Sequence, residues 1–347
     1  MLSVEQIRSQ ATIFQWNARG LRSRLSDFRQ FCHKYQFPVI ALSQSNIASD
    51  FRLSGYEVFH SMRGTAPSRV LVAVRKELTY ISHALPPDAN NEYVALTVKN
   101  DRCIFTIIAA YIPPNTQFNT LRINSIIEST PPPHILTGDF NAHHPLWGSV
   151  KTTIRGTSLA TLIHQHGLFS LNDGSPTFFR GTTVSSCLDL TFASAGLSNV
   201  ITWFTDIECH GSDHIPTYTL LKGFGSNNKS SPIRRTDWSL FKINFENACD
   251  SFDSNEEFFH GIEEVMKQST KTYNLPRTYP VIDAEYERLR ALRRRYERKA
   301  RKTHDPEDMR KARRQQKRIK RRLDKLARRR WRANCVTSDP RRPLSQI

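Results

Sequence analysis

The sequence has few cysteines and no long apolar run. Its 347 residues include six cysteines, scattered without a CxxC pair, so we expect free thiols in a reducing compartment rather than disulfides or a zinc site. No segment approaches the roughly 18–20 apolar residues of a membrane-spanning helix. The N-terminus also lacks the basic and then apolar pattern of a secretory signal. We therefore expect an intracellular protein, nuclear or cytoplasmic, that has no membrane partner.

Acidic residues are scarce near the C-terminal end, where basic residues concentrate. The net charge of the chain is +18, and between Glu285 and Arg332 there are 23 Lys and Arg against 7 Asp and Glu. The first 284 residues therefore carry a net charge of only about +1. A near-neutral body with a very basic tail indicates a polyanionic partner, with nucleic acid as the first candidate. A solvated helical hairpin whose charge serves only solubility is the alternative.

The first two thirds of the chain alternates short apolar strands with amphipathic helices. Residues 12–16 and 39–42 predict strands, and 21–35 predicts a helix because apolar residues recur at spacings of three and four. Such a strand–helix–strand unit is typical of an α/β fold, with polar groups at the carboxyl ends of its strands. Further strands are predicted at 56–59, 70–74, 93–98, 103–111, 135–136, 186–192, 200–204 and 217–221, and helices at 121–128 and 158–166.

A chemically loaded segment follows the buried strand at residues 135–136. Asp139 and Asn141 are two residues apart, so an extended backbone would project both side chains to the same side. Asp139 is a candidate base or metal ligand, and Asn141 is a neutral group that can hold a substrate oxygen. Gly, Asp and Asn also favour turns, so this segment alone leaves a catalytic role and a plain turn open.

Two more segments place charge in unusual positions. Asp189 lies inside an apolar strand, and a buried carboxylate needs a partner. Asp213 and His214 lie in a loop before the strand at 217–221. With Asp189 available to fix its tautomer, His214 is a candidate phosphate-oxygen stabiliser or general acid–base. Asn17 and Tyr111 also end strands, although in isolation a turn residue and a core tyrosine are the plainer interpretations.

The C-terminal third is organised differently. Residues 224–235 are rich in Gly, Ser, Asn and Lys, which is typical of a linker. Residues 237–273 predict one or two short helices, and 285–303 predicts a longer one. Asp305, with the proline and acidic residues after it, is a start signal for another helix. We expect an N-terminal extension at 1–10, a globular domain at 11–221, a linker with short helices at 222–282 and a basic helical tail at 283–347.

Taken together, these segments resemble the endonuclease/exonuclease/phosphatase superfamily over residues 11 to about 221. The run Gly-Asp-Phe-Asn-Ala-His-His-Pro-x-Trp-Gly is specific to the endonuclease domain of non-LTR retrotransposons. The resemblance implies an α/β (α+β) fold with two packed mixed β-sheets flanked by helices, a DNase I-like four-layer sandwich, followed here by a basic α-helical tail. The motifs that carry it are Trp16-Asn17, Tyr111-Ile-Pro-Pro, Thr137-Gly-Asp139-Phe-Asn141, Leu188-Asp189 and Ser212-Asp213-His214.

The resemblance also implies a reaction, the divalent-metal-dependent hydrolysis of a phosphodiester bond that nicks DNA. The metal would be Mg²⁺, with Mn²⁺ as the alternative. Asp139 would activate the attacking water, which Asn141 would position. His214, oriented by Asp189, would stabilise charge on the phosphate, and Tyr111 would contact the phosphate. The residues that would hold the metal or its waters are Gln44, Asn17 and Asp213.

Gln44 departs from the family pattern. The family ends its second strand in Gln-Glu followed by Ser or Thr, and Gln44 occupies the position of that metal-binding Glu. Mg²⁺ prefers carboxylate oxygen, and its charge stabilisation is worth several kcal/mol, so losing most of it would cost roughly 10²–10⁴-fold in rate. A weakened endonuclease and a catalytically inactive nucleic-acid-binding remnant both stay open. A phosphatase acting on lipids or inositol phosphates fits the basic tail poorly.

The basic tail resembles the connector that leads into a reverse transcriptase in such elements. Because the sequence ends at Ile347 without that enzyme, we expect a truncated copy or a fragment of an element. DNA is the expected substrate, and element RNA is a second candidate partner of the tail. The residues expected to contact nucleic acid are Arg293, Arg294, Arg295, Arg313, Arg314, Lys317, Arg318, Arg321 and Arg322.

Overall fold

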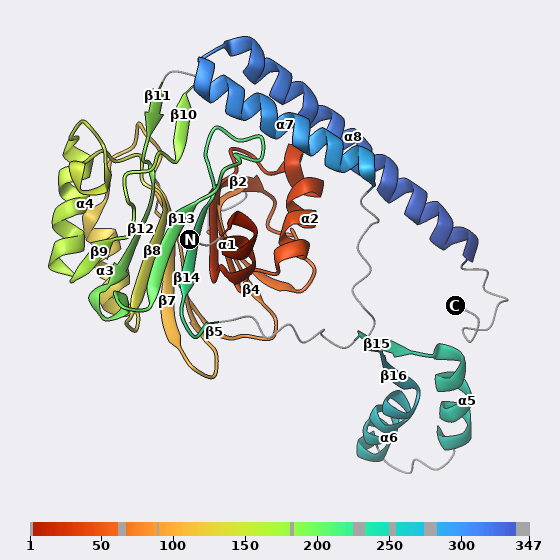
Figure 1. Ribbon diagram of the computed structural model, residues 1–347. Coiled ribbons are helices and arrows are strands. Elements are labelled where there is room, and N and C mark those ends of the chain that lie inside the picture. The colour runs from red at the N-terminus through yellow and green to blue at the C-terminus, as the bar shows by residue number, and fades with distance from the viewer. Residues whose placement is uncertain are drawn as a thin grey trace. The chain divides into compact units, whose positions relative to one another are not determined.

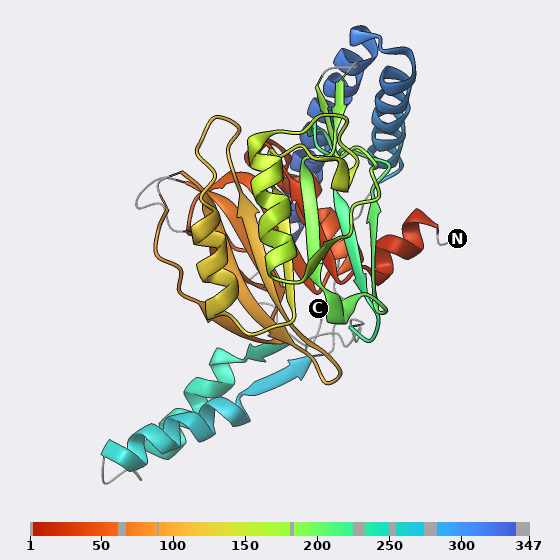
Figure 2. The same ribbon diagram turned by 90° about the vertical axis from the view of Figure 1, so that its left-hand side faces the viewer.

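The computed structural model is shown in Figures 1 and 2. It divides into two units, Met1–Ser226 with Ile282–Ile347, and Asn227–Val281. Most of the predicted linker at 224–235 and the last part of the predicted tail lie outside the residues that the structure describes. Those residues are 3–61, 67–88, 90–180, 184–224, 233–249, 255–273 and 283–337.

Two six-stranded mixed sheets form the body of the first unit. Their facing sides meet through aliphatic residues such as Val39, Val72, Leu96 and Ile107, all fully buried. Strands buried on both faces have nearly continuous apolar sequences, which is why these runs were recognisable. One sheet has the order β13-β14-β1-β2-β4-β3 and the other β5-β6-β7-β8-β12-β9. The bounds are β1 (Ile13–Asn17), β2 (Val39–Ile47), β3 (Tyr56–His60), β4 (Ser68–Arg75), β5 (Thr79–His83), β6 (Glu92–Lys99), β7 (Ile104–Tyr111), β8 (His134–Asp139), β9 (Leu168–Ser170), β12 (Asp189–Ser194), β13 (Ile201–Thr205) and β14 (Thr217–Leu221).

Helices cover the outer faces of both sheets (Figure 1). On the first sheet, Phe28 and Phe31 of α2 pack with Phe14. On the second, Ile123 of α3 and Leu159 of α4 belong to one buried cluster with the strand residues beneath them. This helix–sheet–sheet–helix arrangement confirms the predicted four-layer fold. The helices are α1 (Val4–Gln10), α2 (Leu25–Tyr35), α3 (Thr120–Ser129) and α4 (Ile154–Gln165), and a small hairpin is formed by β10 (Phe178–Arg180) and β11 (Val184–Ser186).

Several elements differ from the sequence-based expectation. Residues 1–10, expected as an extension, contain α1, and β5 was not anticipated. Helix α4 begins four residues before the predicted start at 158. The reason is Thr153, whose hydroxyl accepts a hydrogen bond from the backbone N–H of Gly156 at 3.1 Å and so caps the helix.

Gly138 allows the central strands β7 and β8 to lie close together. Its φ is 144°, and a Cβ at this position would lie 1.9 Å from the carbonyl oxygen of Ala110. A residue with any side chain would therefore separate the two strands or distort them. The parallel pairing that results sets Tyr111 beside Asp139 at the carboxyl ends of β7 and β8.

The predicted basic tail forms an antiparallel hairpin in the first unit. It consists of α7 (Ala284–Thr303) and α8 (Pro306–Thr337), and α8 contacts α2 of the body. The Asp283 side chain caps α7 by accepting a hydrogen bond from the N–H of Tyr286 at 3.0 Å. Apolar residues of the two helices meet in a buried cluster of Tyr286, Leu289, Ile319 and Leu323.

Buried ion pairs fasten this hairpin to the body. Arg293 of α7 has a fully buried side chain, 3.1 Å from a carboxylate oxygen of Asp27 and 3.2 Å from one of Glu208. Arg8 of α1 contacts Glu208 from another side at 3.1 Å and Asp206 at 2.7 Å. Burial opposes ionisation of Glu208, but the surrounding cations outweigh it and hold the pKa of this carboxyl well below its usual range. The segment that leads into His214 is thus held by charges on two helices.

The second unit is a small helical hairpin closed by a two-stranded sheet. It contains α5 (Trp238–Ala248) and α6 (Asn255–Gln268), which confirms the prediction of short helices there. Strands β15 (Ile233–Thr236) and β16 (Thr270–Tyr273), which were not predicted, pair antiparallel. Across the described parts of both units, no helix has the length and apolar character to cross a membrane. The cysteines at 32, 103, 187 and 209 are free.

Candidate active site

Asp139 lies at the centre of the polar edge of the sheets. Its carboxylate accepts a hydrogen bond from the side-chain amide of Asn17 at 2.7 Å and from the backbone N–H of Asn141 at 3.1 Å. Burial raises the pKa of Asp139 to about 7, against the opposing effect of His214 and with a further rise from Asp189. A carboxyl group with a pKa near neutrality is suited to accept and release a proton.

Asp189 and His214 form an ion pair beside Asp139. Strand β12 runs antiparallel to β8 and places Asp189 directly opposite Asp139. The imidazole Nδ1 of His214 lies 2.6 Å from Asp189, whose other oxygen accepts a hydrogen bond from the Gln15 amide at 3.1 Å. Burial alone would lower the pKa of His214, but the Asp189 carboxylate outweighs it and raises that pKa to about 9. The imidazole is therefore a cation at neutral pH, and Nε2 is the ring nitrogen left to meet an anion.

Gln44 pairs with Tyr111 at the same edge. Gln44 has a φ of 47°, and the pairing of β2 with β4 shifts register between Ser43 and Ile47. The Gln44 amide nitrogen donates a hydrogen bond to the Tyr111 hydroxyl. Burial raises the pKa of Tyr111, so the phenol is neutral at physiological pH. A carboxylate at position 44 could not donate this hydrogen bond, but it could accept one from the Tyr111 hydroxyl, so the direction of the bond depends on the amide.

Asn141 lies at the same edge, and the nitrogen of its side-chain amide is already hydrogen-bonded within the protein. Its amide nitrogen donates to the carbonyl oxygen of Ile112 at 3.0 Å, and its φ is 47°. Arg155 supports the same loop by donating to the carbonyl oxygens of Asn141 at 3.4 Å and Pro113 at 3.0 Å. A left-handed backbone conformation held by such contacts is typical of a functional loop.

Asp213 lies at the rim of this group. Its carboxylate pairs with the Arg19 guanidinium and lies 3.5 Å from the Ser212 hydroxyl. Ser212 in turn donates to the carbonyl oxygen of Asn17 at 2.8 Å. Asn17, Gln44, Tyr111, Asp139 and Asn141, with the Asp189–His214 pair, thus gather where the two sheets meet. Asp213 flanks them together with its partner Arg19.

The residues that support the site differ in how clearly the sequence indicates them. Gln15 is a polar residue inside the apolar run of β1, the same signal that drew attention to Asp189. Ser43, whose hydroxyl lies 3.4 Å from the backbone nitrogen of Asp139, directly precedes Gln44. Arg155 had no such signal, because its contacts are to backbone carbonyl groups that any sequence provides.

The groups available to bind a metal ion here are the buried carboxylate of Asp139 and the side-chain amides around it. Among the described residues, no group of three or more His, Cys, Asp and Glu side chains is placed to hold a metal. Asp139 is next to the amide of Asn17, and the amide of Gln44 lies on Tyr111. Mg²⁺ commonly uses one or two carboxylates together with water and substrate phosphate. The donors therefore fit a weak magnesium site that lacks one negative charge.

The structure separates the arginines that were predicted to contact nucleic acid. Arg293 requires a correction: its side chain is fully buried between Asp27 and Glu208, so it cannot meet a ligand. Arg294 is one-third exposed and 3.3 Å from Glu208, and Arg322 pairs with Asp283. The remaining predicted residues are exposed: Arg295, Arg313, Arg314, Lys317, Arg318 and Arg321.

Comparison with known proteins agrees with this geometry. Residues 105–218 match the family described as endonuclease-reverse transcriptase. An RNA-directed DNA polymerase from transposon X-element of Drosophila melanogaster is 24% identical over 309 residues, covering 80% of this chain and 34% of that protein. The solved endonuclease domain of TRAS1, a telomere-specific non-LTR retrotransposon, is 22% identical with a TM-score of 0.54, covering 60% of this chain and 97% of that domain. Residues 105–218 are therefore similar to that family, and the fold is the one that the TRAS1 endonuclease domain has.

Other parts of the chain lie beyond this family match. A Neisseria 3′ phosphatase, solved with a product DNA hairpin, shares the fold at 15% identity and a TM-score of 0.50, covering 61% of this chain and 99% of that one. The chain spans about a third of the length of the curated relatives it matches. The α7–α8 hairpin and the second unit fall outside residues 105–218.

Proposed function

We propose that this domain hydrolyses phosphodiester bonds in DNA and acts as a nicking endonuclease. The observation that supports it best is that a buried carboxyl of near-neutral pKa, Asp139, lies directly opposite Asp189 on the adjacent strand, and Asp189 holds the buried imidazolium of His214. Hydrolysis of a phosphodiester needs a base for water and positive charge at the phosphate oxygens. Asp139 and His214 supply both.

Each residue takes one part in this reaction. Asp139 accepts the proton of the attacking water, and the Asn141 side chain orients that water. His214 donates from Nε2 to a phosphate oxygen while Asp189 fixes its tautomer and charge. The Tyr111 hydroxyl contacts the phosphate from the other side, where Gln44 orients it. Asn17 holds the Asp139 carboxylate in place.

A divalent cation, Mg²⁺ or Mn²⁺, would be held by Asp139 with the amide oxygens of Asn17 and Gln44. Asp213 would bind its waters. When bound, such an ion would supply positive charge that stabilises negative charge on the phosphate oxygens. Because Gln44 brings no negative charge, we expect weak affinity for the ion and a high metal requirement.

Nicking of supercoiled plasmid tests the proposal. The natural chain is compared with Gln44→Glu and Asp139→Ala over a range of Mg²⁺ and Mn²⁺ concentrations. Gln44→Glu should raise the rate by roughly 10²–10⁴-fold, and Asp139→Ala should abolish nicking. If Gln44→Glu nicks no faster than the natural chain, the charge at position 44 is unimportant. If Asp139→Ala retains activity, the assignment of the base is wrong.

A second function, nucleic-acid binding without cleavage, is favoured by one observation. The Gln44 amide is hydrogen-bonded to Tyr111, an arrangement that stabilises the site without a metal. In that case neither the natural chain nor Gln44→Glu would nick, yet both would bind DNA, or element RNA, with strong salt dependence. The same plasmid assay, combined with a binding titration, separates the two functions.

A further inference from the structure

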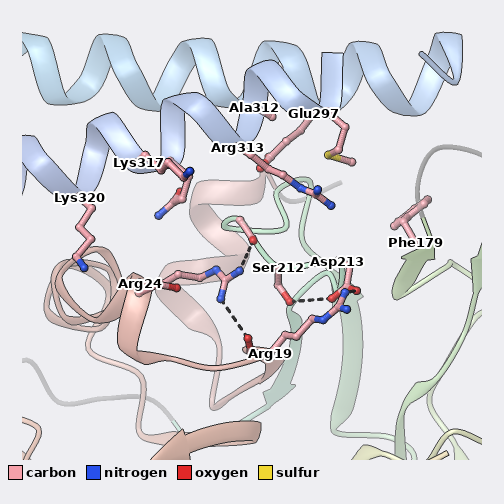
Figure 3. Close-up of a pocket in the computed structure, with 14 residues that line it drawn as sticks. Arg19, Arg24, Phe179, Ser212, Asp213, Glu297, Ala312, Arg313, Lys317 and Lys320 are labelled. Carbon is pink, nitrogen blue, oxygen red and sulfur yellow. Dashed lines mark hydrogen bonds and ion pairs between the residues drawn. The ribbon is translucent and has the colours of Figure 1, made fainter. Parts of the chain in front are cut away.

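A cavity of about 650 Å³ lies between α8 and the body, next to the catalytic centre (Figure 3). The body lines it with the turn that carries Arg19 and Arg24 and with Ser212 and Asp213. Asp139 and Gln44 do not line it, so this cavity is not the catalytic centre itself. Asp213 directly precedes His214, and the cavity therefore begins at the rim of the proposed site.

One stripe of α8 supplies the opposite wall. Arg313, Lys317 and Lys320 line the cavity, and they are spaced by four and three residues, as neighbours on one face of a helix are. Figure 3 shows these side chains and Arg24 on facing walls of the space. The three α8 positions span about 10 Å of helix axis, which matches roughly three nucleotides at ~3.4 Å per nucleotide along one DNA strand.

The positive charge of this cavity is largely uncompensated. Glu297, one of its acidic lining residues, is buried 3.7 Å from Arg293, and Asp213 is paired with Arg19. Arg24 donates to the carbonyl oxygens of Gly20 at 2.8 Å and Gly211 at 2.6 Å. In the part of the chain that the structure describes, no carboxylate pairs with Arg24 or with the three α8 cations. Four cations are therefore left to attract a polyanion.

From these observations we infer that the cavity is a binding subsite for the sugar–phosphate backbone of the DNA strand, about three nucleotides long and adjoining the scissile phosphate. The inference rests on the proposed DNA substrate and adds α8 to the substrate-binding surface. Phe179, which also lines the cavity, offers an aromatic ring for a base. We call Arg313, Lys317 and Lys320, which line the cavity, the inward stripe, and Arg314, Arg318 and Arg321, which do not line it, the outward face. The two sets have different roles, because only the inward stripe adjoins the site.

The helix provides its own matched control. The inward variant is Arg313→Ala with Lys317→Ala and Lys320→Ala. The outward variant is Arg314→Ala with Arg318→Ala and Arg321→Ala. Each removes three exposed positive charges from the same helix, and the two sets are rotated by one residue, about 100° around the axis. Alanine preserves helix propensity.

Binding is measured by fluorescence anisotropy of a labelled 30-base-pair DNA duplex with the full chain in EDTA, where metal-dependent cleavage cannot occur. The inward variant should bind at least tenfold more weakly at about 0.1 M salt. Its slope of log K against log salt should fall by about 2–3, because roughly 0.9 of a counterion is released per phosphate contact. The outward variant should lose less than half as much. A second pair, Lys317→Gln and Arg318→Gln, repeats the comparison with single substitutions.

Equal losses in the two variants, or no loss in either, would overturn the subsite, and tighter binding by the inward variant would show instead that α8 obstructs DNA. Nicking by the natural chain is assayed separately. If no chain nicks but the inward variant alone loses affinity, the proposed reaction fails while the subsite stands. If the natural chain nicks and the inward variant has an unchanged KM for plasmid, the subsite fails while the reaction stands.

Discussion

Removing Arg293 should destabilise the first unit strongly. Its guanidinium is fully buried and contacts Asp27 at 3.1 Å and Glu208 at 3.2 Å. Arg293→Ala would leave three buried carboxylates, those of Asp27, Glu208 and Glu297, with fewer counter-charges, and breaking a buried ion pair typically costs 3–5 kcal/mol. Asp27 keeps its hydrogen bond from Tyr286 at 2.7 Å, and Glu208 keeps Arg8 at 3.1 Å. We therefore expect a loss at the lower end, about 3 kcal/mol of unfolding free energy.

The assays are equilibrium unfolding in urea and thermal unfolding, both followed by tryptophan fluorescence, to which the buried Trp16, Trp147 and Trp203 contribute. At ~2–4 °C per kcal/mol for a unit of this size, the midpoint of thermal unfolding should fall by about 6–12 °C. Arg294→Ala is the control, because this side chain is 32% exposed and also contacts Glu208. It should cost at most about 1 kcal/mol.

A third variant separates lost charge from lost packing. Arg293→Met combined with Asp27→Asn and Glu208→Gln removes Arg293 together with the two carboxylates closest to it, and replacing buried ion-pair groups as a set is often close to neutral. This triple variant should be more stable than Arg293→Ala. A cost of less than about 1 kcal/mol for Arg293→Ala, or one equal to that of Arg294→Ala, would refute the reasoning. The hairpin would then be only loosely held.

Two further predictions concern the body of the domain. Gly138→Ala should prevent correct folding or cost more than about 3 kcal/mol, since the new Cβ would lie 1.9 Å from the Ala110 carbonyl oxygen; a soluble variant with an unchanged melting temperature would contradict this. Asp206 is buried, which opposes ionisation, but His210 and Arg8 lower its pKa from 3.8 to about 2. Because the folded pKa is depressed, its stabilisation of about 2 kcal/mol is complete above pH 3.8 and is lost as the pH falls through 2. Asp206→Asn should flatten the dependence of unfolding free energy on pH in that window, and an unchanged slope would exclude this role.

The sheet architecture could be predicted because its strands are buried on both faces. Continuous apolar runs such as 39–42 and 70–74 have few other places to lie in a soluble domain. The strand β5 escaped prediction because its residues are mostly exposed, so its sequence lacks an apolar pattern. The early start of α4 depends on a cap by Thr153. A threonine is equally compatible with a strand or a loop, so the sequence alone cannot decide its role.

The polar residues of the site could be identified, but only some of their partners could. A carboxylate inside an apolar strand, as at Asp189, has to be paired, and the sequence offered His214 as the partner. The hydrogen bond between Gln44 and Tyr111 was not foreseeable, since it depends on a φ of 47° at Gln44. Position 44 was judged only by the charge it lacks. The structure adds that its amide has a structural partner, the Tyr111 hydroxyl, which in Gln44→Glu would have to donate to the carboxylate instead.

The charge count of the C-terminal segment treated all its cations as one population, and this is where sequence reasoning was furthest from the structure. A helix with cations on every side must bury some of them when it packs, and burial requires counter-charges. Those counter-charges are Asp27 and Glu208. They are distant from α7 in the sequence and belong to a body whose net charge is close to zero. The small net charge of the body therefore does not reveal that two of its acidic residues pair with α7. Among the described residues, no carboxylate pairs with the cations that α8 directs toward the cavity. This difference in pairing, rather than the total charge, indicates where a polyanion would bind.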